Sequence, residues 1–171
     1  MFLINSALAI FIQAISLYTI NFTDTNGKVQ SFSSFKGKKI LIVNTATGSS
    51  RVNQLAELQQ LQTKYDKRLV IVVFPSNSFG NEPRSNGEIR SFCQSAYGTT
   101  LLIAEKGITN GEDKSSVYQW LTDKTKNGAI DIPVKGDFQK FLIDADGTIE
   151  GVFAGSVSPL SNQIQKAILA Q

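Results

Sequence analysis

The chain has 171 residues, 42% of them apolar and 18% charged, which is typical of one globular domain and excludes a disordered or fibrous chain. The net charge of +3 comes from scattered Lys and Arg without a basic stripe, which argues against nucleic-acid binding. There is no His and a single Cys, Cys93, so Ser–His and Cys–His dyads, most zinc sites and an intramolecular disulfide are excluded. We therefore expect no metal and no cofactor.

Residues 1–14 are almost wholly apolar and end in Gln13-Ala14, a plausible signal-peptidase site. The segment carries no basic residue and is too short to span a bilayer comfortably. Two interpretations follow, a cleaved signal peptide or a buried N-terminal extension. The first would place the protein outside the cytoplasm (periplasmic or secreted), and the second in the cytoplasm. In both cases residues 15–171 are expected to form a single domain.

The pattern from residue 17 to residue 43 predicts a β-hairpin followed by a buried strand. Residues 17–22 alternate like a strand, 25–27 form a turn with an Asn-Gly pair, and 29–32 form the returning strand. Residues 40–43 are continuously apolar and mostly β-branched, which favours a fully buried strand.

The stretch from residue 44 to residue 74 predicts a βαβ unit. A polar turn at 44–50 leads into a helix at about 53–67, and residues 69–74 form a second buried strand, parallel to the first. Unpaired backbone N–H groups and the positive end of the helix dipole should face Ser49 in this turn. Such a place can hold an anion or activate a nucleophile, and it lies at the sheet edge where open α/β sheets place their sites.

The rest of the chain predicts helices and strands that cover this unit. A helix at about 86–97 carries Cys93 on its apolar face, and Trp120 lies on an apolar helical stripe that indicates core rather than a ligand platform. Residues 138–143 and 148–153 form a second hairpin, and its Asp-x-Asp-Gly turn lacks the glutamate that a calcium loop needs. A closing helix is expected at 158–169.

Several local motifs occur together in one order and nearly one spacing. They are Lys36-Gly37-Lys38, Leu41-Ile42-Val43-Asn44, Phe74-Pro75-Ser76-Asn77-Ser78-Phe79-Gly80, Glu82-Pro83, Phe92-Cys93-Gln94, Tyr97-Gly98, Asn110-Gly111 and Phe138-Gln139-Lys140-Phe141-Leu142. In this set the chain resembles the glutathione peroxidases from Tyr18 to the last helix. The resemblance implies an α/β thioredoxin-like fold, a central mixed β-sheet flanked by helices with an N-terminal β-hairpin. It also implies thiol-dependent hydroperoxide reduction in the response to oxidative stress, with glutathione or thioredoxin as the reductant.

The resemblance also places the chemistry of the family on four positions, and all four differ here. The peroxidatic Cys or selenocysteine falls at Ser49, and the Gln of the Phe-Pro-Cys-Asn-Gln-Phe-Gly motif falls at Ser78. The Trp and Asn of the Trp-Asn-Phe motif fall at Gly136 and Asp137. The resolving cysteine of thioredoxin-dependent members corresponds to Cys93, which is present without its partner.

These replacements predict lost or strongly reduced peroxidase activity. A helix N-terminus lowers the pKa of a thiol from about 8.5 into a range of about 3.5–7.5, but an alcohol starts many units higher and cannot cycle through sulfenic acid. Gly136 removes the indole donor, and Asp137 adds a negative charge. The alternatives are a peroxidase that works through Cys93, a pseudoenzyme that binds a small anion at residues 48–51, and an interaction module. We expect Cys93 to be a buried, inert thiol, and a Ser hydrolase lacks an evident base.

Overall fold

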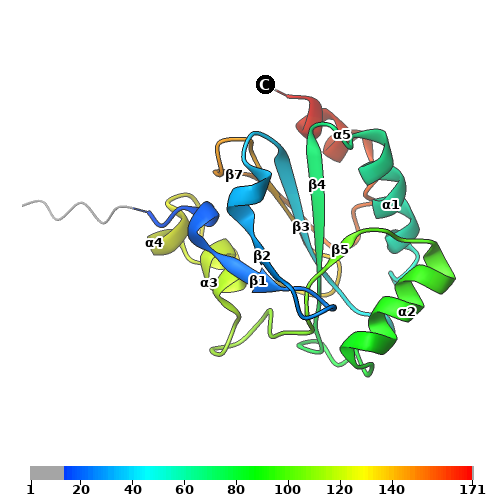
Figure 1. Ribbon diagram of the computed structural model, residues 1–171. Helices are drawn as coiled ribbons and strands as arrows, with labels where there is room; N and C mark the ends of the chain where they lie inside the picture. Colours follow the sequence, from blue (N-terminus) through cyan, green and yellow to red (C-terminus); the bar gives the residue numbers. More distant parts are fainter. Residues whose placement is uncertain (1–13, 171) are drawn as a thin grey trace, which may run out of the picture.

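The computed structural model describes residues 14–170, which form a mixed five-stranded sheet, a two-stranded hairpin and five α-helices (Figure 1). The sheet has the order β5-β4-β3-β6-β7. Its strands are β3 (Lys39–Thr45), β4 (Leu69–Pro75), β5 (Leu102–Ile103), β6 (Lys140–Ile143) and β7 (Ile149–Phe153). The helices are α1 (Gln54–Lys64), α2 (Asn86–Tyr97), α3 (Ser116–Thr122), α4 (Lys124–Asn127) and α5 (Asn162–Leu169).

The predicted βαβ unit is confirmed. β3 and β4 pair in parallel over their full length, from Lys39 opposite Leu69 to Thr45 opposite Pro75. β3 also pairs antiparallel with β6, and β6 pairs antiparallel with β7, so the second predicted hairpin is confirmed as well. Every residue of β3 is buried because the strand lies in the middle of the sheet with both faces covered.

Two apolar clusters fill the two faces of the sheet. Figure 1 shows α1, α2 and α5 on one face, where Leu58 and Leu61 of α1 pack with Ile89 of α2 and Ile164 of α5. The N-terminal hairpin and α3 cover the other face, where Trp120 is 2% exposed and belongs to the core as predicted. This layered arrangement is the predicted thioredoxin-like fold.

The N-terminal hairpin is shorter than predicted. Residues Leu17–Thr19 form a 3-10 helix, η1, because the Ser16 hydroxyl accepts a hydrogen bond from the Tyr18 N–H and caps it. The strands proper are β1 (Asn21–Thr23) and β2 (Val29–Ser31), and a second 3-10 helix, η2 (Phe32–Phe35), follows them. The expected strand at 17–22 is therefore wrong in its first half.

Two helices also begin later than predicted. α5 begins at Asn162 rather than at 158, because the Ser161 hydroxyl accepts from the Ile164 N–H and caps it there. α1 runs from Gln54 to Lys64 instead of about 53–67.

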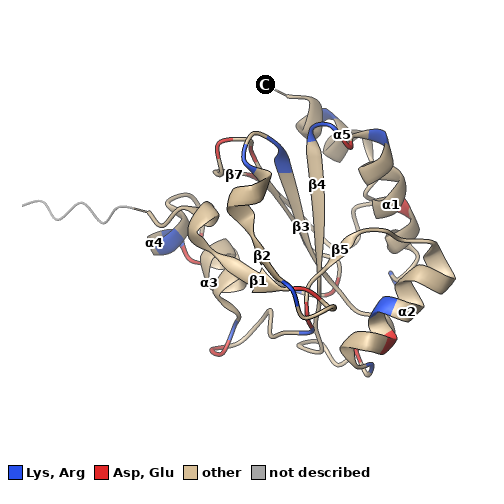
Figure 2. Cartoon of the chain, in the orientation of Figure 1, with Lys and Arg blue, Asp and Glu red and all other residues tan. Residues whose placement is uncertain are grey.

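The expectation of a signal peptide or a buried extension at residues 1–14 falls almost wholly outside the described residues. Within residues 14–170, no helix is long and apolar enough to cross a membrane. Figure 2 shows Lys and Arg spread over separate elements, with Asp and Glu distributed among them.

Candidate active site

Ser49 lies in the turn that joins β3 to α1, called the Ser49 turn here (residues 46–53), and it is 5% exposed. Its N–H donates to the Ala46 carbonyl at 3.2 Å, and its carbonyl accepts from the Val52 N–H at 3.1 Å. α1 begins only at Gln54, and its N-cap is Asn53. Tight i→i−3 backbone bonds link Ser49 to the helix, so the residue lies near the helix N-terminus without capping it.

Several backbone N–H groups of this turn have partners within the fold, where the sequence predicted unpaired ones. The Thr47 N–H donates to the Glu82 carboxylate at 2.7 Å, and the Gly48 N–H donates to the Asn81 carbonyl at 2.9 Å. The Arg51 N–H donates to the Ser49 hydroxyl at 3.3 Å. The N–H groups of Thr47, Gly48 and Arg51 therefore bind partners within the fold rather than a ligand.

Asp137 is 3% exposed and reaches the Ser49 turn through Asn81. The Asn81 side-chain amide donates to Asp137 Oδ2 at 2.6 Å, while the Asn81 carbonyl accepts from Gly48. Asp137 Oδ1 is buried and has no hydrogen-bond partner among the described residues. The structure therefore joins two of the predicted positions, 49 and 137, in one neighbourhood that carries a buried carboxylate.

Gly136 leaves room beside Asp137. A Cβ built at position 136 would meet no atom within 4 Å, so a side chain could begin there without a clash. A cavity of about 240 Å³ opens beside Gly136 and Asp137, and its lining includes Arg51 and Lys135, both exposed. Two cations and one carboxylate therefore surround this cavity.

Ser78 lies apart from these residues. Its hydroxyl accepts from the Ser76 hydroxyl at 2.9 Å and from the Thr109 N–H at 3.1 Å. It lines a cavity of about 420 Å³ together with Lys106 and Ile108, and neither Gly136 nor Asp137 lines that cavity. No hydrogen bond joins Ser78 to Ser49 within residues 14–170.

Cys93 is buried on the inner face of α2, 3% exposed, in the apolar cluster that includes Ile89. Burial, and then the charge of Glu82, raise the pKa of its thiol to about 11, against a smaller opposite effect of Arg84. A thiol in this state is almost wholly protonated at neutral pH. The expected burial of Cys93 is therefore seen in the structure.

A buried carboxylate behind the Ser49 turn was not singled out from the sequence. Glu82 is 1% exposed, and its carboxylate accepts from both the N–H and the hydroxyl of Thr47, at 2.7 and 2.6 Å. Arg84 Nη1 donates to the same Thr47 hydroxyl at 2.7 Å. The available signal was an acidic residue beside Pro83 in an otherwise polar loop, which is weak without the partner thirty-five positions away.

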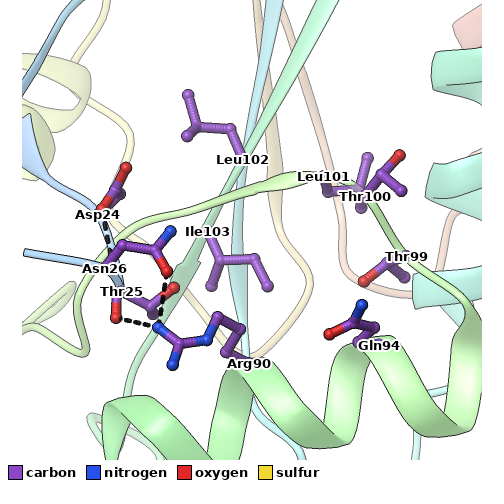
Figure 3. Close-up of a pocket in the computed structure, with 10 residues that line it drawn as sticks. All are labelled: Asp24, Thr25, Asn26, Arg90, Gln94, Thr99, Thr100, Leu101, Leu102 and Ile103. Carbon is purple, nitrogen blue, oxygen red and sulfur yellow. Dashed lines mark hydrogen bonds between the residues drawn. The ribbon is translucent and has the colours of Figure 1, made fainter. Parts of the chain in front are cut away.

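Another pocket, of about 220 Å³, shares no lining residue with the cavity at Gly136. Figure 3 shows it between the hairpin turn, α2 and residues 99–103, with Arg90 pointing toward Thr25 and Asn26. The Arg90 guanidinium donates to the Thr25 carbonyl at 2.7 Å and to Asn26 Oδ1 at 2.8 Å. These bonds attach α2 to the hairpin and explain the position of Arg90.

The fold and the buried turn at the carboxyl edge of β3 define a thioredoxin-like domain. A family model described as "Glutathione peroxidase" matches residues 17–122. Glutathione peroxidase-like peroxiredoxin 2 of Saccharomyces cerevisiae is 38% identical over 158 residues, which cover 90% of this chain and 97% of the relative. A glutathione peroxidase of Lactococcus lactis subsp. cremoris is 36% identical over 157 residues, 90% of this chain and 99% of the relative. The chain belongs to the glutathione peroxidase family.

Solved structures agree with this assignment. The crystal structure of Trgpx in its apo form superposes with a TM-score of 0.70 at 29% identity, over 92% of this chain and 98% of that one. A thioredoxin family thiol:disulfide interchange protein from Chlorobium tepidum reaches a TM-score of 0.63 at 19% identity, over 91% and 97% of the two chains. At that identity the second likeness shows the fold alone.

Proposed function

We propose that this chain is a glutathione peroxidase family member that has lost thiol-based peroxide reduction at position 49. One observation carries the proposal: the buried strand-to-helix turn presents an oxygen, that of Ser49, where the resemblance places sulfur or selenium. An alcohol in this turn is neither ionised near neutral pH nor able to form a sulfenic acid and then a disulfide. The buried, protonated state of Cys93 supports the proposal, because it leaves no second reactive thiol.

Asp137 supports the proposal through its charge. A nucleophile that works as an anion is disfavoured beside a carboxylate, because like charges raise the pKa of an acidic group. Asp137 is buried next to the Ser49 turn, and the structure gives it no ion-pair partner within residues 14–170. Replacing only Ser49 by Cys therefore restores the sulfur near a buried carboxylate that opposes its ionisation.

The test is a peroxidase assay with hydrogen peroxide and an organic hydroperoxide. Separate arms of the assay contain glutathione with its reductase or thioredoxin with its reductase, because the family resemblance suggests these two reductants. The native chain and Cys93→Ser should both stay at the background rate, as should the matched control Ser49→Ala. Ser49→Cys should gain a small rate, and the combination with Ser78→Gln, Gly136→Trp and Asp137→Asn a larger one.

Robust turnover by the native chain that disappears in Cys93→Ser would overturn the proposal, because it would show that the active thiol lies on α2. Turnover that survives in both Cys93→Ser and Ser49→Ala would indicate a contaminating peroxidase. Thermal unfolding of each variant separates lost chemistry from lost folding.

A second candidate function is a binding role for the former active site, with a small anion or carboxylate-bearing ligand. Arg51 and Lys135 favour it, because both cations line the cavity beside Gly136. Because several N–H groups of the Ser49 turn already have partners within the fold, the two side chains are the main groups proposed to bind the ligand. Calorimetry with phosphate, sulfate and glutathione tests it, with Arg51→Gln/Lys135→Gln as the control, and an absence of binding at millimolar concentration would contradict it. A protein partner at the same place is the remaining alternative.

A further inference from the structure

Phe138 has an unusual backbone conformation. Its φ angle is +63°, and it is the one residue other than glycine with positive φ in the described part of the chain. A left-handed backbone is unfavourable for a bulky L-residue, and it persists only where the surroundings hold it in place. The Phe138 ring is fully buried, so the ring and this backbone geometry are fixed together.

Interior hydrogen bonds hold the residues around Phe138, called the 136–138 loop here. The Phe138 N–H donates to the Asn44 carbonyl at 2.7 Å, and the Asn44 side chain donates to the Gly136 carbonyl at 3.0 Å. Lys140 Nζ donates to the Phe138 carbonyl at 2.7 Å. Both polar groups of the strained residue therefore have fixed partners in β3 and β6.

Lys140 is the unusual member of this set. Its side chain is fully buried, and no carboxylate lies within ion-pair distance of it in the described residues. Lys39, the other buried lysine of the sheet, pairs with Glu150 at 2.6 Å. Burial without a paired anion is costly for an ammonium group, and burial lowers the pKa of Lys140 to about 8. The charges that face it are Glu57 on α1, which raises its pKa, and Arg51 of the Ser49 turn, which lowers it.

We propose that Lys140 is a positioning residue of the candidate active site. By holding the Phe138 carbonyl, it keeps Phe138 in its left-handed conformation and so holds the 136–138 loop where Asp137 meets Asn81 beside the Ser49 turn. A charged donor suits this role because its hydrogen bond is stronger than that of a neutral one. The inference concerns how the site is held, and it does not depend on the proposed loss of turnover.

Amide hydrogen exchange of the native chain and of Lys140→Met tests the proposal. Loss of one hydrogen bond from a charged donor should speed exchange of the Phe138 N–H by about tenfold or more, relative to amides of the β3–β6 ladder. Lys39→Met is the matched control, since it also removes a buried lysine but at the other end of β3. Lys39→Met should lower the protection of amides against exchange across the β3–β6 ladder and at Phe138 to a similar degree. Equal loss of protection at Phe138 and in the ladder of Lys140→Met would overturn the proposal.

A pH titration of the native chain followed by NMR keeps the proposal testable if Lys140→Met fails to fold. The amide signals of Asp137 and Phe138, and the side-chain NH₂ of Asn81, should shift together with a midpoint of about 8, the pKa of Lys140. A merely structural lysine would leave the Asn81 signal unmoved. Signals that stay constant between about pH 6.5 and about pH 9.5 would contradict the proposed role.

Discussion

The reactivity of Cys93 is the sharpest measurable consequence of the structure. Its thiol pKa is raised from an ordinary value of 9.0 to about 11, which lowers the thiolate fraction at neutral pH about a hundredfold. A more basic thiolate is also more nucleophilic, with a Brønsted coefficient of about 0.4–0.5, and this returns roughly a tenfold factor. Ionisation alone should therefore slow alkylation of Cys93 about tenfold relative to an ordinary thiol.

Burial adds a second and larger barrier. Cys93 is 3% exposed beneath α2, so a reagent reaches its sulfur only after a local opening of the helix. The assay follows iodoacetamide labelling of the native chain against pH, with a cysteine peptide and the chain unfolded in guanidinium as references. Native labelling should be at least tenfold slower than either reference at pH 7 and should still be rising above pH 9.

Two results would refute this reasoning. Labelling of the folded chain as fast as that of the peptide would show that the sulfur is accessible. A midpoint below about pH 8 would show that a positive charge, Arg84 being the nearest candidate in the structure, outweighs burial and Glu82. Either result would also reopen peroxide chemistry at Cys93.

Three further predictions concern stability. Glu82→Gln should cost about 1–3 kcal/mol in urea unfolding, because its NH₂ replaces one of the two oxygens that accept from Thr47 and the Arg84 N–H, and an NH₂ cannot accept. The exposed capping-box change Glu88→Gln should cost less, and equal losses would contradict the role given to Glu82. Gly155→Ala should strongly destabilise the fold, since its Cβ would lie 2.2 Å from the Asp137 carbonyl oxygen. The control Gly87→Ala in α2, whose Cβ would meet no atom within 4 Å, should be neutral or stabilise by up to about 1 kcal/mol. Equal changes in the free energy of unfolding of the two variants would contradict the close packing at Gly155. The free energy of unfolding should rise with pH from about 8 to 9, because Lys140 releases its proton near pH 8 in the folded chain and near 10.5 in the unfolded chain. Above about pH 9 the Cys93 thiol opposes this rise, because it ionises at a lower pH in the unfolded chain than in the folded one. Chemical denaturation against pH should show this rise in Cys93→Ser and not in Lys140→Met, and a rise in both would assign it to another group.

The central part of the fold could be predicted because its signals are local. Residues 40–43 and 69–74 are continuous apolar runs joined by a segment of helical period, and such a pattern allows few arrangements other than two parallel strands and a crossover helix. The N-terminal strand was predicted too long because alternation does not reveal the cap: the Ser16 hydroxyl accepts from the Tyr18 N–H, and backbone bonds close a 3-10 helix over residues 17–19.

The site was less predictable because its geometry depends on distant partners. The Thr47 and Gly48 amides of the Ser49 turn look free in the sequence, yet Glu82 and Asn81 accept from them across more than thirty residues. Ser78 turns toward Thr109 for the same reason. Phe138 gives no sequence signal of positive φ, since glycine or asparagine would be the expected residue there.

Positions 49 and 137 are physically coupled through Asn81. Its side chain donates to the Asp137 carboxylate while its carbonyl accepts from Gly48, so a change at 137 is felt one residue from Ser49. A carboxylate is tolerable beside an uncharged hydroxyl, but beside a thiolate it adds repulsion in a site that water scarcely reaches. Asp137→Asn should therefore leave the peroxidase rate at background on its own and raise it clearly when it is combined with Ser49→Cys. Such non-additivity is expected of residues that share one hydrogen-bonded neighbour, and an uncharged hydroxyl at position 49 is compatible with a carboxylate at position 137.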